Sequence, residues 1–160
     1  MTDTMDQEPP LLARWLGYAG LLPFVGLAAA AWLTQAPVHA HVAMALLAYG
    51  AAILSFLGAI HWGLAMRESH SQIGGRQLLW GVIPSLGAWV ALLLPPGDGL
   101  MLVAFGLWAC FLVDRRAYPR FGLGAWLPMR LTLTTIASLA CMAGAWGAGA
   151  HPAISCITQP

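Results

Sequence analysis

The sequence predicts an all-α membrane protein, a bundle of about five transmembrane helices, and three observations lead to this prediction. Hydrophobic residues make up 59% of the 160 positions and charged residues only 8%, whereas soluble globular domains carry about 25% charged residues. The mean hydropathy is +0.73. Apolar runs long enough to cross about 30 Å of hydrocarbon alternate with short polar segments. Together these features exclude a soluble domain.

The first predicted span runs from Leu11 to Leu33. It follows residues 1–10, a polar and acidic stretch that lacks the positive n-region of a signal peptide and is predicted to be a disordered cytoplasmic cap. Trp15 and Trp32 lie near the two ends of the span, as interfacial anchors do. Pro23 falls in the middle, where it removes a backbone donor and is expected to kink the helix.

The second and third spans are predicted on either side of a polar loop. The second covers about His41 to Met66 and follows a short connection, residues 34–40, that contains neither acid nor arginine. The loop, residues 67–76, contains two turn-forming glycines. The third span runs from Gln77 to Leu94, with a bend expected at Pro84.

The fourth and fifth spans complete the predicted transmembrane domain, residues 11–148. The sequence PPGDG at 95–99 is a strong turn signal, and the fourth span, Leu100 to Val113, is short for a crossing. The fifth runs from about Trp126 to Ala148. A flexible outer tail is predicted at residues 149–160.

Arginine placement predicts the orientation. With five spans, the amino terminus and the second-to-third and fourth-to-fifth loops lie on one side, and all basic residues of the chain fall there: Arg14, Arg67, Arg76, Arg115, Arg116, Arg120 and Arg130. Positive residues favour the cytoplasmic side. We therefore expect a multi-pass protein of the cell inner membrane, with its amino terminus inside and its carboxyl terminus outside. The net charge of +1 gives no indication of a nucleic-acid partner.

Small residues recur every fourth position along the second span, at Ala51, Ser55, Ala59 and Gly63. They share one helix face, where another helix can approach closely. The pattern suits packing within one chain and packing between chains equally well. Other membrane proteins, a second copy and the lipid bilayer are thus the expected partners.

His61 is the residue of the apolar run Tyr49 to Met66 that titrates nearest neutral pH. It precedes Arg67 by six residues, about 9 Å along a helix from the predicted cytoplasmic boundary. Ionisable residues inside a membrane are often functional, so His61 is a candidate proton-handling group, quinone ligand or metal ligand. The alternative is a neutral histidine that bonds to a neighbouring helix.

Asp114 and Arg130 are predicted to pair, because one ends the fourth span and the other begins the fifth, beside a short loop. Pairing lowers the cost of placing each charge at the membrane edge and pins the two helices. The candidate functional polar cluster consists of His61, Trp62, Ser85, Asp114 and Arg130.

Metal and catalytic signals are weak. His39, His41 and His151 are predicted at the outer face, where helix packing could gather them, with Cys156, around copper or zinc. No carboxylate pattern completes such a site, so the metal and the cofactor stay unassigned. The chain has no GxSxG, HExxH or phosphate-binding glycine loop. An enzyme is therefore the less favoured interpretation.

Several segments resemble a known family. They are Tyr49 with ILSFLG at 53–58, HWG at 61–63, VIPSL at 82–86 with Trp89, and WLP with RLTLT between 126 and 134. This pattern is similar to that of a small bacterial inner-membrane family of unknown function, to which a mitochondrial transmembrane protein of animals is related. The resemblance covers about Arg14 to Gly147. It implies a multi-helix inner-membrane protein and carries no catalytic residues with it.

Two functions follow from the sequence. The favoured one is a non-enzymatic helical bundle that assembles or stabilises membrane complexes or interacts with lipids. The alternative is quinone-linked or proton-linked binding of a small molecule on the cytoplasmic side, around His61.

Overall fold

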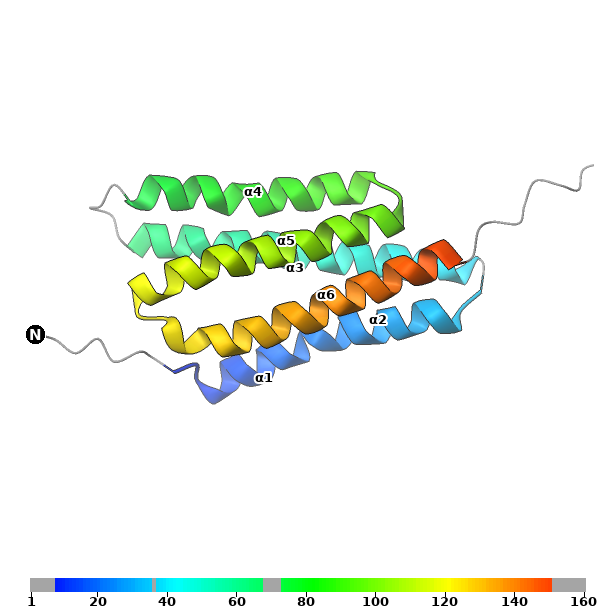
Figure 1. The fold of residues 1–160 in the computed structure, drawn as a ribbon, viewed down its shortest axis with the longest axis horizontal. Coiled ribbons are helices and arrows are strands. Elements are labelled where there is room, and N and C mark those ends of the chain that lie inside the picture. Colours follow the sequence, from blue (N-terminus) through cyan, green and yellow to red (C-terminus); the bar gives the residue numbers. More distant parts are fainter. Residues whose placement is uncertain (1–7, 36, 68–72, 151–160) are drawn as a thin grey trace, which may run out of the picture.

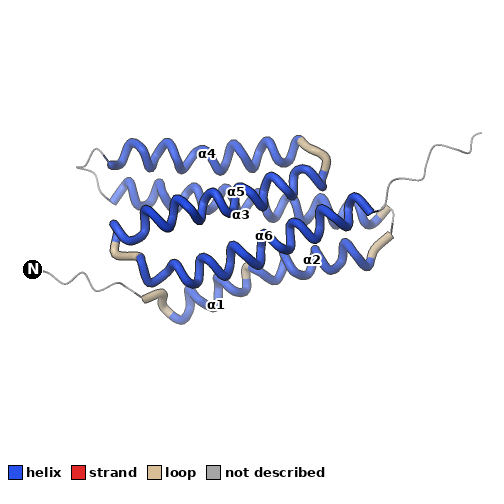
Figure 2. Tube along the Cα trace, in the orientation of Figure 1, coloured by secondary structure: helices blue, strands red, loops and turns tan. Residues whose placement is uncertain are grey.

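The computed structural model describes residues 8–35, 37–67 and 73–150, and within them the chain is helical without a strand. Helices lie side by side along one direction (Figures 1 and 2). Their bounds are α1 Leu11–Ala19, α2 Leu21–Leu33, α3 Val38–Arg67, α4 Ile73–Leu93, α5 Pro96–Ala117 and α6 Leu127–Ala150, with two 3₁₀ turns, η1 Tyr118–Phe121 and η2 Gly124–Trp126, between α5 and α6. The all-α prediction is confirmed.

Five segments of the described chain are long and apolar enough to cross a membrane. They are Leu11–Leu33, Val38–Arg67, Gly75–Leu93, Pro96–Phe121 and Gly124–Gly147. The number of spans agrees with the sequence analysis, and the chain is a multi-pass membrane protein. The predicted domain limits at 1–10 and 149–160 fall largely on residues that the structure does not describe.

The fourth span is longer than predicted, because α5 begins at Pro96, inside the segment that was expected to be a turn. Proline fits the first turn of a helix, where the missing N–H has no intrahelical partner anyway. Gly99, in the first turn of α5, also lets this helix pack closely against α4. A Cβ there would collide with the Ala91 carbonyl of α4, so the absence of a side chain lets α4 and α5 approach closely.

The first span breaks at Gly20 into α1 and α2, three residues before Pro23. This agrees with the predicted kink, because Pro23 cannot donate a hydrogen bond to the carbonyl four residues earlier. The Tyr49 hydroxyl of α3 donates to the Gly20 carbonyl at 2.9 Å. The ring of Tyr49 also meets Phe24 edge to face, with 5.0 Å between ring centroids. Tyr49 therefore anchors the break to the middle of the bundle.

Helix α3 is the centre of the bundle, and it contacts α2, α4, α5 and α6. Its buried residues recur every three or four positions along 30 residues, from His39 to Ala65, as expected for one continuous inward face. By contrast, α1 has no buried residue and lies at the edge of the bundle (Figure 1).

A close contact between helices also joins α3 and α4 at two glycines. A Cβ on Gly58 would collide with the Gly81 carbonyl, and a Cβ on Gly81 would collide with the Trp62 ring. The Trp62 indole N–H donates to the Leu78 carbonyl at 3.1 Å across the same contact. Gly58 and Gly81 thus fix the register of these two antiparallel helices.

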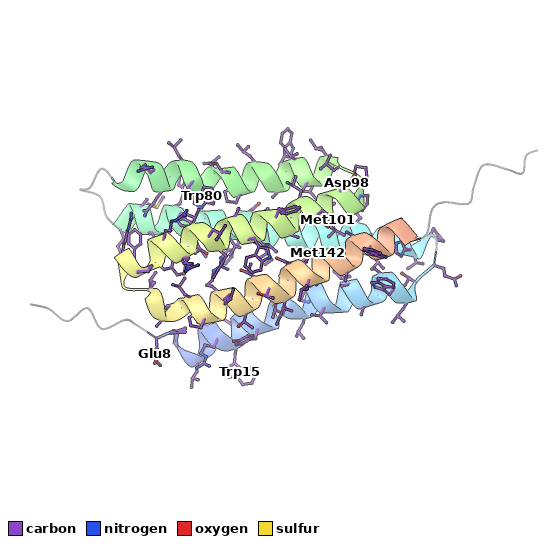
Figure 3. All side chains as sticks on the ribbon, in the orientation of Figure 1. Glu8, Trp15, Trp80, Asp98, Met101 and Met142 are labelled. Carbon is purple, nitrogen blue, oxygen red and sulfur yellow. The ribbon has the colours of Figure 1, made fainter. Side chains whose placement is uncertain are left out.

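All seven arginines belong to helix ends or loops at one end of the bundle: the start of α1, α4 and α6, and the end of α3 and α5 with η1. Glu8 and Trp15 lie at that end, whereas Asp98 lies at the other, where α4 meets α5 (Figure 3). We call these the arginine end and the opposite end. The charge asymmetry expected from the sequence is therefore present.

Candidate functional site

Three buried polar side chains meet near the arginine end of the bundle. His61 of α3 is 1% exposed, Asp114 of α5 2% and Arg130 of α6 8%. The His61 Nε2 atom lies 2.9 Å from Asp114 Oδ1. Arg130 donates to the other carboxylate oxygen, Oδ2, from Nε at 3.0 Å and from Nη2. We call these three residues the triad. Through these hydrogen bonds Asp114 links α3, α5 and α6.

Local structure explains how two of these groups meet. Asp114 lies in the last turn of α5 and Arg130 is the fourth residue of α6. The connection between them contains two short 3₁₀ turns and Gly122, whose φ of 67° is readily adopted only by glycine. Each charge is at the less favourable end of its own helix dipole, since anions prefer helix N-termini and cations C-termini. The two charges are thus stabilised by each other and not by their helices.

The hydrogen bonds define the protonation pattern of the triad. An ionised carboxylate accepts only, so His61 Nε2 carries the proton that it donates to Asp114. In a neutral His61 the other nitrogen, Nδ1, is then an acceptor, and Nδ1 is buried with no partner among the described residues. Arg130 and Asp114 compensate each other's charge, so the triad has no net charge when His61 is neutral. Buried ions require this kind of compensation.

Cys110 and Tyr118 border the triad. They lie one helical turn before and after Asp114, and both interact electrostatically with Asp114 and Arg130. Cys110 is a buried free thiol, as is Cys141 of α6. Tyr118 is buried as well, and it lines the cavity described next.

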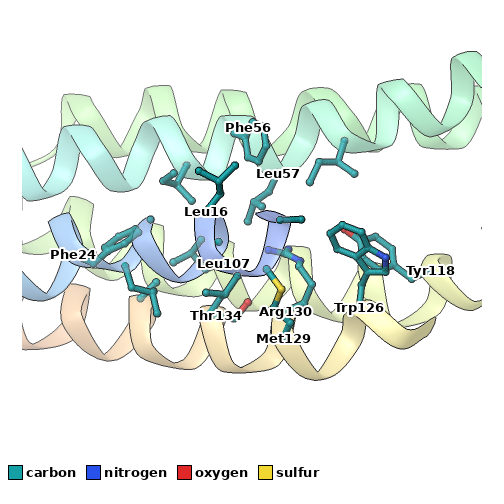
Figure 4. A pocket seen from close by; sticks show the side chains of 18 of the residues that line it. Leu16, Phe24, Phe56, Leu57, Leu107, Tyr118, Trp126, Met129, Arg130 and Thr134 are labelled. Carbon is teal, nitrogen blue, oxygen red and sulfur yellow. The ribbon is translucent and has the colours of Figure 1, made fainter. Parts of the chain in front are cut away.

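A cavity of about 530 Å³ adjoins the triad, between α1 and α2 on one side and α3 and α6 on the other. Its lining is mostly aliphatic and aromatic, and Arg130 is the charged side chain among the described residues that line it. Figure 4 shows its walls, with Phe56 and Leu57 facing residues of the other helices across the space. The labelled lining residues are Leu16, Phe24, Phe56, Leu57, Leu107, Tyr118, Trp126, Met129, Arg130 and Thr134.

The Arg130 guanidinium thus contacts Asp114 with two of its nitrogens, and the same side chain borders the cavity. Its Nε and Nη2 donors are taken by Asp114, which leaves Nη1 as the nitrogen not committed to the carboxylate. Ligand sites are typically apolar hollows of about 300–1,000 Å³ with a few placed polar groups, and this cavity has that character.

The structure brings together only part of the predicted polar cluster. His61, Asp114 and Arg130 form the triad, so the predicted ion pair between Asp114 and Arg130 is present. Trp62 follows His61 in the sequence, but its indole N–H donates to the Leu78 carbonyl of α4 and not to the triad. Ser85 is half-buried on α4, and no hydrogen bond joins it to the triad in the part of the chain that the structure describes.

The four small residues of α3 do not lie at one helix contact. Ala51 is buried and Ser55 half-buried, whereas Ala59 and Gly63 are exposed, and a Cβ on Gly63 would meet nothing within 4 Å. Within the chain, close approach occurs one position away, at Gly58. The exposed half of the pattern stays a prediction about other chains.

The outer histidines are only partly described. His39 is buried on α3, and His41 is exposed with its Nδ1 3.2 Å from the Pro37 carbonyl. His151 and Cys156 lie outside the described residues. Among the residues that are described, no group of three or more histidine, cysteine or acidic side chains could hold a metal. The metal hypothesis is untested where it depends on His151.

Comparison with known proteins decides the family. Residues 9–146 match the model of a protein family of unknown function, DUF3429. The chain belongs to this family. It is also 32% identical over 157 residues to Transmembrane protein 69 of Xenopus tropicalis, an alignment that covers 96% of this chain and 61% of that protein. The chain thus spans about three fifths of the curated relative's length. No solved structure matches the chain.

The family assignment agrees with the resemblance found in the sequence, and the family gives no activity. Sequence reasoning missed the cavity and its lining from α1 and α2. The one signal that could have indicated it is the Gly20–Pro23 break, which lies next to Leu21 and Phe24 in the cavity wall.

Proposed function

We propose that this protein binds a hydrophobic small molecule within the membrane, in the cavity beside the triad, with isoprenoid quinones as the ligand class to test first. The single observation behind the proposal is the cavity of about 530 Å³, whose lining is mostly apolar and includes the polar side chains Arg130, Tyr118 and Thr134. A buried arginine is costly, and here one of its edges borders a space of ligand size. This deepens the quinone hypothesis that the sequence suggested for His61.

In this proposal His61 does not touch the ligand. It supports Asp114, which holds the Arg130 guanidinium in place through Nε and Nη2. The hydrocarbon part of the ligand contacts the aliphatic and aromatic walls. Arg130 and Tyr118 supply hydrogen bonds to its polar end.

Trp126 gives a direct test because it lines the cavity and quinones quench tryptophan fluorescence. The purified chain in lipid nanodiscs is titrated with a short-chain ubiquinone analogue. We expect saturable quenching with a component that Trp126→Phe removes. Quenching that is linear in quinone, or unchanged in Trp126→Phe, would contradict the proposal.

A matched pair of variants separates cavity binding from partition into lipid. Ala13 lines the cavity and Ala52 is exposed on α3. Ala13→Phe fills the space and should weaken saturable binding at least about tenfold. Ala52→Phe adds the same ring on the lipid side and should leave binding unchanged.

A second proposed function is a role in assembling or stabilising another membrane protein, as the sequence favoured. The specific support is the exposed pair Ala59 and Gly63, at which a helix of another chain could approach. Native mass spectrometry after mild extraction from the source membrane tests it. A partner polypeptide that Gly63→Leu releases, with the fold intact, is the expected result; a lone chain would count against this role.

A further inference from the structure

The polar end of the cavity determines which ligands fit, because it presents a donor and no free charge. Arginine has five N–H groups and no acceptor. Asp114 accepts from Nε and from one N–H of Nη2, so the two N–H groups of Nη1 and the second N–H of Nη2 are not bonded to the carboxylate. The Tyr118 side chain also hydrogen-bonds Arg130. A molecule with an acceptor, such as a carbonyl oxygen, suits the donors that remain.

The charge of Arg130 is already compensated. Asp114 lies against the guanidinium and is 2% exposed. His61 Nε2 lies 2.9 Å from the other carboxylate oxygen. A negative head group would therefore add a charge beside an arginine that Asp114 already balances, and buried unpaired charges are strongly unfavourable.

Other arginines do not change this balance. Arg14 of α1, Arg116 at the end of α5 and Arg120 of η1 lie at the same end of the bundle. None of them lines the cavity. Arg116 and Arg120 are exposed, and charges in contact with water are screened.

We infer that the cavity selects molecules whose polar end is an uncharged hydrogen-bond acceptor, as in a ketone, ester or quinone, and rejects anionic lipids of similar chain length. This inference rests on the proposed binding function and adds the ligand's charge class. Arg130 Nη1 donates a hydrogen bond to the acceptor of the ligand. Asp114 makes an uncharged ligand preferable, because its carboxylate already balances the charge of Arg130.

A matched pair of probes tests the inference in the full chain. Dibrominated stearic acid and its methyl ester share one hydrocarbon chain, whose bromines quench nearby tryptophans, and differ in charge when the acid is ionised. Binding is followed in nanodiscs through the quenching that Trp126→Phe removes. The buffer is held at about pH 9, far above the ordinary pKa of a carboxyl group.

We expect the ester to bind at least about tenfold more tightly than the carboxylate. Equal or tighter binding of the carboxylate would overturn the inference and leave the proposed cavity in place. If neither probe nor the quinone gives Trp126-dependent quenching, the proposed function fails as well.

The variant Asp114→Asn provides a reversal test. It replaces one of the two carboxylate oxygens, which accept from His61 and Arg130, by an amide nitrogen and leaves the guanidinium charge unbalanced. The carboxylate probe should therefore gain at least about tenfold in affinity relative to the ester. An unchanged ratio of affinities in folded Asp114→Asn would overturn the assignment of Asp114. Should this variant not fold, the comparison of the two probes on the unaltered chain still decides the inference.

Discussion

At the scale of single residues, Asp114 is the side chain on which most of the polar interior depends. It accepts from His61 and from two nitrogens of Arg130, and all three residues are buried. Removing its charge leaves Arg130 as an unpaired cation. The resulting loss of folding stability should come from this unpaired charge and not from a change in side-chain volume.

We therefore expect Asp114→Asn to reduce the free energy of unfolding by about 3–5 kcal/mol, the usual cost of breaking a buried ion pair from one side. Adding Arg130→Met should restore the greater part, because the introduced amide oxygen still accepts from His61 and no charge is left unpaired. Reversible denaturant unfolding in mixed micelles measures both. A double variant less stable than Asp114→Asn would contradict this account.

The sequence predicted the pair formed by Asp114 and Arg130 because only a short loop separates two charges of opposite sign at equal depth. It could not predict that His61 joins them, since His61 and Asp114 are 53 positions apart in the sequence. That contact depends on which helices are neighbours and on how each is rotated, and nothing local encodes either. The same holds for the cavity, whose walls come from α1, α2, α3, α5 and α6.

At the scale of helices, glycines determine where α3 approaches its neighbours. Gly58 and Gly63 lie on the same helix, but only Gly58 has a backbone carbonyl, that of Gly81, in the place of its missing side chain. Small-residue spacing alone predicted a contact along the face that contains Gly63. Within the chain, α4 packs on the adjacent face at Gly58, and a contact of the Gly63 face with another chain stays a prediction.

The substitution Gly58→Ala should therefore destabilise the chain by about 1–3 kcal/mol, as overpacking does. Gly63→Ala is its matched control, because the added methyl meets nothing within 4 Å, and the change to alanine favours the helix by up to about 1 kcal/mol. Thermal unfolding followed by fluorescence compares the two. Equal losses in both variants would mean that close approach at Gly58 is unimportant.

The break between α1 and α2 is another helix-scale feature with a testable role. Tyr49→Phe removes the hydroxyl that bonds the Gly20 carbonyl but keeps the ring against Phe24. We expect a loss of about 1 kcal/mol and faster amide hydrogen exchange in residues 16–24 than in α3 to α6. Exchange measured by mass spectrometry gives the answer; uniform acceleration across all helices would show that the bond does not act locally.

At the scale of the whole molecule, the arginines make the distribution of charge asymmetric along the long axis of the bundle. All seven lie at one end, whereas Asp98 lies at the opposite end, in the first turn of α5. Fold class and number of spans could be predicted because hydropathy and length determine them almost alone. Span boundaries were less predictable, as α5 shows, because proline can open a helix as well as end one.

The positive-inside rule predicts that the arginine end faces the cytoplasm. In a chain carrying Cys156→Ser, Gln35→Cys should react with a membrane-impermeant maleimide added to intact cells, and Glu8→Cys only after lysis. Cys110 and Cys141 are buried and should contribute little background. The reverse pattern would place the arginine end outside.

The order of synthesis gives the triad a further consequence. A ribosome releases the chain from its amino terminus, so α3 and α5 leave the ribosome before Arg130 of α6 does. Until then Asp114 has His61 as its partner in the triad and no cation to balance it. Entry of α6 supplies the missing charge and closes one wall of the cavity in the same step. A chain stalled before α6 would therefore display an unbalanced carboxylate at the membrane edge, a mark by which quality control could distinguish unfinished chains from finished ones.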